Sequence, residues 1–174
     1  MIYFKKFILI LSIIFFSQQS LLADIPHFLD FKYILNESTA GKKAQSFLRN
    51  KLDKGIKNLQ KKEKDIQSEE KKLIEQKKII APEEYKKSVQ SLRTKVSSIQ
   101  KERKSLLETV AKQRNLARKK LLDNLNPIVK NYMEEKKIRI VLDKKSLLLA
   151  DEKLDITNDI LGLLNKKLTS IKLN

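Results

Sequence analysis

The side chains that could carry out chemistry are few in this chain. There is no cysteine and only one histidine, His27, so the sequence excludes disulfides, thiolate nucleophiles and metal sites built from several histidines. The acidic pairs Glu69-Glu70 and Glu134-Glu135 lie in lysine-rich stretches, where we interpret them as solvated surface rather than as acid and base in a cleft. Neither a glycine-rich phosphate loop nor a Ser–His–Asp arrangement is recognisable. We therefore predict that the chain is not an enzyme and uses no cofactor or metal.

The residues that stand out instead are basic ones in a single stretch. Residues 41–120 hold 25 Lys and Arg against 10 Asp and Glu, a net charge of +15 out of the +17 carried by all 174 residues. Such a basic surface indicates an acidic or unfolded macromolecule as partner, not a small substrate. The candidate contacts are basic and apolar side chains near the middle of this stretch: Lys71, Lys72, Ile74, Lys77, Lys78, Ile79, Tyr85, Lys86 and Lys87. For any one of these lysines taken alone, a solvated helix face is the simpler explanation.

These side chains must be positioned by long helices, because apolar residues recur at helical spacing on both sides of Pro82. In the first helix, expected from about Thr39 to Ile80, they recur every seven residues, which is typical of a coiled coil. These positions are Leu52, Leu59, Ile66, Leu73 and Ile80. In the second helix, expected from Pro82 past Lys120, the spacing alternates between four and three residues. Its seam positions are Tyr85, Val89, Leu92, Val96, Ile99, Arg103, Leu106, Val110, Gln113 and Ala117. The polar side chains of Arg103 and Gln113 are expected to weaken this seam.

The two helices are predicted to form an antiparallel hairpin with its tip near residues 81–84. Pro82 suits the first turn of a helix, where its missing N–H costs nothing, and Glu83 and Glu84 suit the positive end of the helix dipole. If the chain reverses there, one register sets four seam pairs side by side. The pairs are Leu73 with Val89, Ile66 with Val96, Leu59 with Arg103, and Leu52 with Val110. This shared register favours a hairpin over two independent helices or a partly disordered tract.

Shorter elements are expected on either side of the hairpin. Branched and apolar residues predict strands at 24–35, 138–143 and 147–150. Asn126-Pro127 interrupts the helical pattern and is expected to kink the helix where the arm becomes the base. A last helix is expected at about 158–168, capped from within 155–158. The predicted fold class is therefore mostly α with a small β body. A long antiparallel coiled-coil hairpin, the arm (41–120), stands on a body (24–40 and 121–174) where the first strand meets the later ones. Since such a chain buries little core, we expect oligomerisation to supply part of its stability.

Residues 1–23 have the three parts of a secretory signal peptide. Lys5 and Lys6 precede a ten-residue apolar run at 7–16, and a short segment of polar and small residues leads to a predicted cleavage site after Ala23. The apolar run is too short to span a bilayer as a stable helix, although an uncleaved anchor remains the alternative. We therefore predict that the mature chain starts at Asp24 and is exported.

The order of signal peptide, strand, coiled-coil hairpin, strands and capped helix resembles the Skp/OmpH family of periplasmic chaperones. Three local sequences carry the resemblance. Phe-Leu-Asp followed by Ile-Leu-Asn-Glu-Ser-Thr-Ala-Gly-Lys, within 28–42, is similar to the opening strand of the family and the start of its arm. Pro-Glu-Glu-Tyr at 82–85 is similar to the arm tip. The sequence 138–143, followed by Asp-Ile-Thr at 155–157, is similar to the closing strand and last helix.

The resemblance implies a homotrimer located in the periplasm, with three arms that reach from a trimerisation body around a cavity. It implies an ATP-independent holdase, in which unfolded protein binding keeps outer-membrane proteins from aggregating during outer membrane protein assembly. Basic arms would attract acidic unfolded chains at long range, and scattered apolar side chains would add weak contacts. The lysines near the tip could also contact anionic lipid or lipopolysaccharide.

Two other functional classes remain open at this stage. The positive charge also satisfies the electrostatic requirement of a nucleic-acid binder. An exported protein meets little nucleic acid, however, so we expect no physiological nucleic-acid partner. The second class is an envelope coiled-coil scaffold or structural protein, which would favour a longer rod, a more regular seam and little need for a β body.

Overall fold

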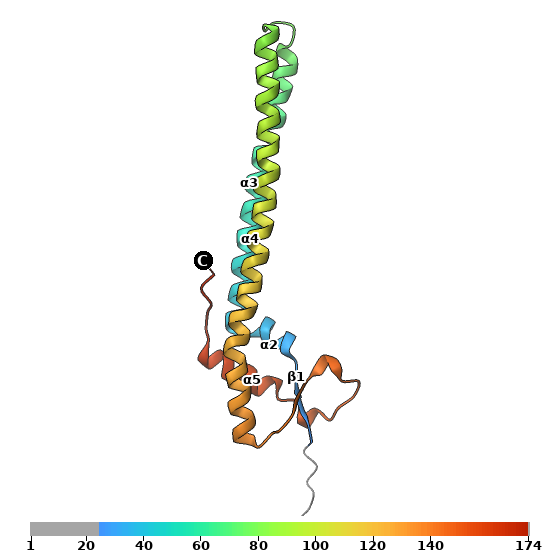
Figure 1. The fold of residues 1–174 in the computed structure, drawn as a ribbon, viewed down its shortest axis with the longest axis vertical. Helices are drawn as coiled ribbons and strands as arrows, with labels where there is room; N and C mark the ends of the chain where they lie inside the picture. The colour runs from blue at the N-terminus through green and yellow to red at the C-terminus, as the bar shows by residue number, and fades with distance from the viewer. Residues whose placement is uncertain (1–24, 174) are drawn as a thin grey trace, which may run out of the picture.

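The computed structural model describes residues 25–173, so the predicted signal peptide lies outside the described residues. Two long helices, α3 (Thr39–Gln76) and α4 (Pro82–Lys136), form an antiparallel hairpin, and the smaller elements gather at its open end (Figure 1). The chain reverses between the two helices at residues 77–81. The predicted fold class, mostly α with a long helical hairpin and a small β body, is confirmed. Within residues 25–173, no helix combines the length and the apolarity needed to cross a bilayer.

The ends of the two long helices follow from local hydrogen bonds. The buried hydroxyl of Ser38 caps α3 by accepting a hydrogen bond from the backbone N–H of Gly41 at 3.1 Å. At the other end, the N–H groups of Ile79 and Ile80 both donate to the carbonyl of Gln76, so the helix ends four residues before the predicted Ile80. The second helix begins at Pro82, as predicted, and continues to Lys136.

The helical pattern is interrupted at Asn126-Pro127 in the sequence, but α4 continues through Pro127 without a break. On either side of the proline, Leu125 is fully buried and Ile128 is 7% exposed in the core of the body. The packing of these two side chains holds the helix in place although proline supplies no N–H for the helical ladder. The long helix therefore connects the arm and the body as one continuous rod.

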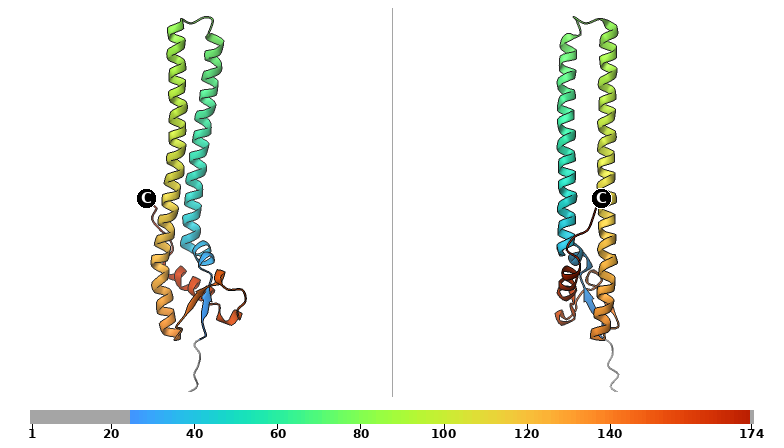
Figure 2. Two further views of the ribbon diagram at one scale, coloured as in Figure 1. Left: turned by 45° about the vertical axis from the view of Figure 1, so that its right-hand side comes forward. Right: turned by 90° about the vertical axis from the view of Figure 1, so that its left-hand side faces the viewer.

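The hairpin keeps close to the predicted register. Gly55 lies against the side chain of Leu106, and an ion pair joins Lys62 to Glu102 at 2.6 Å. These contacts agree with the predicted pairing to within one helical turn. The two helices lie side by side along the length of α3, and α4 extends further into the body (Figure 2). The buried residues of this seam are Leu48, Leu59 and Leu73 from α3, and Ile99, Val110, Gln113 and Ala117 from α4.

The core of the body forms where segments from both ends of the sequence meet the lower part of α4. The short helix α2 (Phe31–Glu37) and the last helix α5 (Thr157–Lys167) pack against it. The core residues are Leu29, Ile34, Leu125, Ile128, Ile138, Ile156, Ile160 and Leu164. The hydroxyl of Thr157 accepts a hydrogen bond from the backbone N–H of Asp30 at 2.9 Å, which ties the first and last elements together. The last helix, predicted at about 158–168, is thus displaced by only one residue.

The sheet of the body is smaller than predicted. Strands β1 (His27–Leu29) and β2 (Val141–Asp143) pair in parallel, with Phe28 opposite Leu142. The strand predicted at 147–150 is absent, since 144–146 form a short 3-10 helix and Leu148 and Leu149 are almost completely exposed. A second 3-10 helix spans Glu152–Leu154. The other edge of β1 is occupied by the chain just before α5, where the N–H of Ile156 donates to the carbonyl of Phe28 at 2.9 Å.

The strand predicted over 24–35 is limited to β1, because the following residues form α2. Asp30 caps this helix: its carboxylate accepts a hydrogen bond from the N–H of Tyr33 at 2.8 Å. The N-cap formed by Asp30 thus prevails over an aromatic and apolar run whose composition predicts a strand. After α5, residues 168–173 run back alongside the lower part of the hairpin (Figures 1 and 2).

Candidate functional site

The predicted contact residues lie together at the far end of the hairpin, in what we call the tip segment (71–87). It comprises the last turns of α3, the reversal of the chain and the first turns of α4. Ile74 and Ile79 are 61% and 84% exposed, so both apolar side chains face solvent. The ring of Tyr85 is half-buried, and its centroid lies 5.8 Å from the ammonium nitrogen of Lys77. The other predicted lysines of the segment are exposed: Lys71, Lys72, Lys78, Lys86 and Lys87.

Ion pairs across the hairpin use part of the acidic charge and leave the lysines of the tip segment unpaired. Glu69 binds Lys95 and Glu63 binds Arg103, each at 2.5 Å. Among residues 25–173, by contrast, none of the six lysines of the tip segment forms an ion pair. Arg103, a polar residue at a seam position, therefore contributes a bond between the helices. Charged partners approaching the arm meet a surface with an excess of free positive charge.

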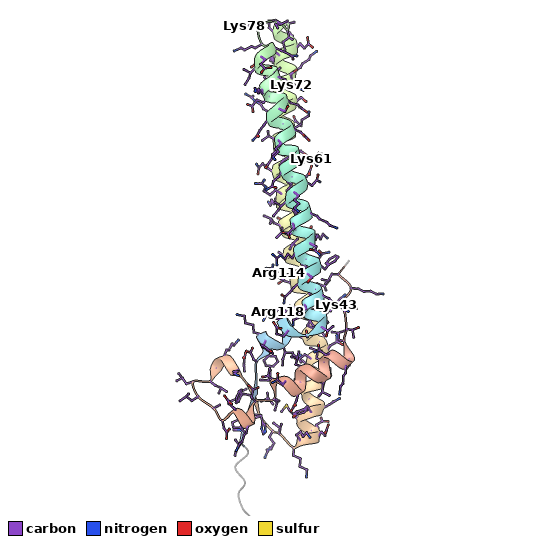
Figure 3. The ribbon with its side chains drawn as sticks, turned by 180° about the vertical axis from the view of Figure 1, so that it is seen from behind. Lys43, Lys61, Lys72, Lys78, Arg114 and Arg118 are labelled. Carbon is purple, nitrogen blue, oxygen red and sulfur yellow. The ribbon has the colours of Figure 1, made fainter. Side chains whose placement is uncertain are left out.

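Basic side chains also extend along the arm below the tip segment. Figure 3 shows Lys78 at the far end, Lys72 and Lys61 further down, and Arg114, Arg118 and Lys43 near the body. Such a distribution gives an extended basic surface rather than one localised patch.

The seam opens slightly between the helices next to the tip. A shallow hollow of about 260 Å³ is lined there by polar and apolar side chains from both helices. They are Glu69, Lys72, Leu73, Gln76, Ser88, Ser91 and Leu92. Of the predicted contact residues, only Lys72 lines this hollow. Its small and open shape does not suit a tightly bound small molecule.

Comparison with known proteins shows to which family the chain belongs. Residues 27–164 match the family described as outer membrane protein (OmpH-like). The chain belongs to this OmpH-like family. An uncharacterised protein of Aquifex aeolicus (strain VF5) is 34% identical over 157 residues, which cover 87% of this chain and 96% of that protein. A crystal structure of a candidate OmpH-like outer membrane chaperone from Caulobacter crescentus CB15 has the same fold. Its TM-score is 0.81 at 18% identity, with 86% of this chain and 90% of that chain covered.

Several apolar residues of the OmpH-like arm that the sequence analysis did not select are also exposed. They are Phe47, Ile56, Val96, Leu107 and Leu116, with exposed fractions between 37% and 52%. Val96 was expected in the seam beside Ile66, but its side chain is 46% exposed. A signal was available for three of them. Leu107 and Leu116 fall outside the four-and-three spacing of the second helix, and Phe47 falls outside the seven-residue spacing of the first. The arm thus combines free lysines with exposed apolar side chains from its tip to its base.

The body of the OmpH-like chain has a second hollow of about 430 Å³ between α4 and α5. Beside it, the hydroxyl of Tyr132 donates a hydrogen bond to the carboxylate of Asp159 at 2.5 Å. Partial burial and this bond raise the pKa of Tyr132 to about 12, so the phenol stays protonated at neutral pH. Neighbouring Glu134 and Glu135 are exposed and lie within 4 Å of lysines, which is typical of a solvated surface. Within residues 25–173, no group of three metal-ligating side chains converges.

Proposed function

We propose that this chain is an ATP-independent holdase chaperone of the periplasm. It would bind unfolded outer-membrane proteins between basic helical arms and prevent their aggregation before membrane insertion. Membership of the OmpH-like family supports the proposal. The name of the Caulobacter crescentus structure, an OmpH-like outer membrane chaperone, supports the chaperone part of the proposal.

The observation that carries the proposal is the mixture of free lysines and exposed apolar side chains along the arm. An unfolded barrel protein exposes apolar residues at alternate positions and aggregates through them. Isolated side chains such as Ile74, Ile79 and Phe47 offer many weak contacts to such a chain without selecting a sequence. The unpaired lysines add long-range attraction for acidic clients, which salt would screen. Binding through many weak contacts also permits release.

Exposed apolar residues of the body support the proposal of a homotrimer. Ile140 and Leu142 are 48% and 37% exposed, and Leu148 and Leu149 are almost completely exposed. The outer edge of β2 has no partner strand within residues 25–173, and an open edge invites pairing with another chain. Sedimentation equilibrium of the mature chain (24–174) tests this step. A mass of three chains is expected, and a monomer at micromolar concentration would contradict it.

The function itself is tested by the aggregation of a client. A urea-unfolded outer-membrane barrel protein is diluted into buffer without nucleotide, and its turbidity is followed with and without the mature chain. Suppression near three chains per client is expected, and it should weaken with increasing salt because the arm attracts clients partly by charge.

A matched pair of variants separates the arm from net charge. Lys86→Glu/Lys87→Glu reverses two exposed neighbouring lysines in the tip segment, and Lys166→Glu/Lys167→Glu does the same in α5. Both variants change the net charge equally, so only the first should reduce client protection. Equal protection by both variants would refute the electrostatic role of the tip segment. If even the unmodified chain leaves aggregation unchanged at all ratios and salt concentrations, an envelope scaffold becomes the better description.

A further inference from the structure

The segment after α5 packs against both helices at the base of the arm. The side chain of Leu173 is only 7% exposed and joins Ala44, Leu48 and Ala117 in a small apolar cluster, with Ile171 packed beside it. We call the surroundings of Leu173 the arm-base site. The two alanines leave room for the leucine side chain between α3 and α4. This segment lies beyond residues 27–164, which match the OmpH-like family.

Polar contacts hold the main chain of the segment rather than its side chains. The side-chain amide of Gln113 donates to the carbonyl of Leu173 at 3.4 Å, and the ammonium group of Lys120 donates to the carbonyl of Lys172 at 2.8 Å. Gln113 is itself 8% exposed, and its amide oxygen accepts a hydrogen bond from Lys51 at 3.1 Å. The seam position of Gln113 thus has a physical reason: its amide donor binds the segment. Without a partner there, a buried donor would be left unsatisfied.

These contacts define what the arm-base site recognises. Carbonyl oxygens are present in every polypeptide, so the bonds from Gln113 and Lys120 do not depend on sequence. The site adds a preference for one buried apolar residue, Leu173, with a second apolar residue, Ile171, two positions earlier. Apolar residues at alternate positions are the pattern of a β-strand in a transmembrane barrel.

We propose that the arm-base site binds extended polypeptide with apolar residues at alternate positions, and that residues 169–173 occupy it as a built-in competitor. This inference rests on the proposed function, in which such polypeptides are the unfolded clients. The segment leaves the site when a client strand of the same pattern replaces its apolar contacts and its two carbonyl acceptors. Residues 169–173 then compete with clients for the base of the arm. This competition weakens client binding and favours release.

The test uses the full mature chain and a fluorescein-labelled peptide with the sequence of residues 168–174. Leu173→Asp expels the segment from its apolar site, and Ser170→Asp makes the same charge change at an exposed position of the segment. By fluorescence anisotropy, Leu173→Asp should bind the peptide about tenfold more tightly than the unmodified chain, because the competing leucine is no longer buried. Ser170→Asp should behave like the unmodified chain. Adding Ala44→Leu to Leu173→Asp fills the site and should abolish the gain. Circular dichroism checks that each variant is folded.

The same experiment shows whether clients use the site. An unfolded outer-membrane barrel protein should displace the peptide from the Leu173→Asp variant. Equal peptide affinity in Leu173→Asp, Ser170→Asp and the unmodified chain would overturn the binding site. Peptide binding that the barrel protein cannot displace would overturn the competition with clients. Failure of the proposed function itself is seen separately, as unchanged client turbidity with every variant, and does not alter the peptide result.

Discussion

Replacing Gly41 with alanine tests how closely α2 packs against the start of α3. A Cβ atom at this position would lie 2.0 Å from the carbonyl oxygen of Leu35 and 2.8 Å from the hydroxyl of Ser38. The first of these atoms belongs to the backbone, so it cannot rotate away, and the two helices must separate by about 1 Å. The destabilisation caused by overpacking reaches about 3 kcal/mol at the upper end of its usual range, and we expect that value here. Displacement of the Ser38 cap adds about 1 kcal/mol, whereas the better helix propensity of alanine returns about 1 kcal/mol. The expected net loss of stability is therefore about 3 kcal/mol.

The other two glycines provide internal comparisons for the same substitution. A Cβ at Gly162, in α5, would meet nothing within 4 Å, so Gly162→Ala should stabilise the chain by about 0.5–1 kcal/mol. A Cβ at Gly55 would meet only the side chain of Leu106, at 2.4 Å, and a side chain can rearrange. Gly55→Ala should therefore fall between the two. Urea unfolding followed by circular dichroism, at one protein concentration for all variants, measures the differences. Equal stability of Gly41→Ala and the unmodified chain would refute the packing argument.

Three further predictions concern the body. Lys137 follows the last residue of α4 with a φ of 57°, a left-handed conformation that glycine adopts without strain. Lys137→Gly should therefore raise the free energy of unfolding by about 1 kcal/mol in the same urea assay. Tyr132→Phe removes the hydrogen bond to Asp159 and should cost about 1 kcal/mol. The pKa of Tyr132 is raised to about 12, so the stability that the protonated phenol adds is complete below the usual tyrosine pKa of about 10 and is lost as the pH rises from about 10 to 12. Urea unfolding curves of the unmodified chain and of Tyr132→Phe, measured over a series of pH values, would detect this loss. Burial opposes ionisation of Asp155, but hydrogen bonds from Lys144 and Thr157 and the charge of Lys144 hold its pKa below the usual value, so Asp155→Asn should lower stability above about pH 4 and have less effect in acid.

The long-range arrangement of the arm could be predicted from sequence because few residues determine it. Leucines such as Leu59 and Leu73 at seven-residue intervals define the seam, and Pro82 marks the start of the second helix. The short elements were harder because one hydrogen bond decides between alternatives there. The carboxylate of Asp30 starts α2 in the middle of an apolar run that otherwise predicts a strand.

The missing strand at 147–150 has a different cause. Its leucines have the right composition for a strand, but a strand also needs an edge to pair with. Both edges of β1 are taken, by β2 and by the chain at Asp155 and Ile156, and only the outer edge of β2 stays open. The leucines do not pair with that edge, because residues 144–146 form a 3-10 helix and Leu148 and Leu149 are almost completely exposed. Which segment reaches an edge depends on the path of the whole chain, and a local pattern does not contain that information.

The candidate contact surface could be predicted in its charge but only partly in its apolar residues. Lysines in a helical sequence are exposed wherever they stand outside the seam, so the positive surface follows from composition alone. Exposed apolar residues require the seam to be known at each position. Phe47 and Leu107 lie outside the seam and could have been found, whereas Val96 occupies an expected seam position and is nevertheless half exposed.

The polar residues in the seam and the exposed apolar residues of the arm have the same effect: both reduce the apolar packing between α3 and α4. An arm selected only for stability would bury Phe47 and Leu107 and place leucines at positions 103 and 113. Here Arg103 uses its seam position for an ion pair with Glu63, and Gln113 uses its position to bind the segment that ends at Leu173. Apolar surface that could have joined the helices remains available to other chains, at the expense of hairpin stability. Exposed apolar side chains on a hairpin that is joined partly by polar contacts would suit the weak and reversible binding of unfolded protein proposed above.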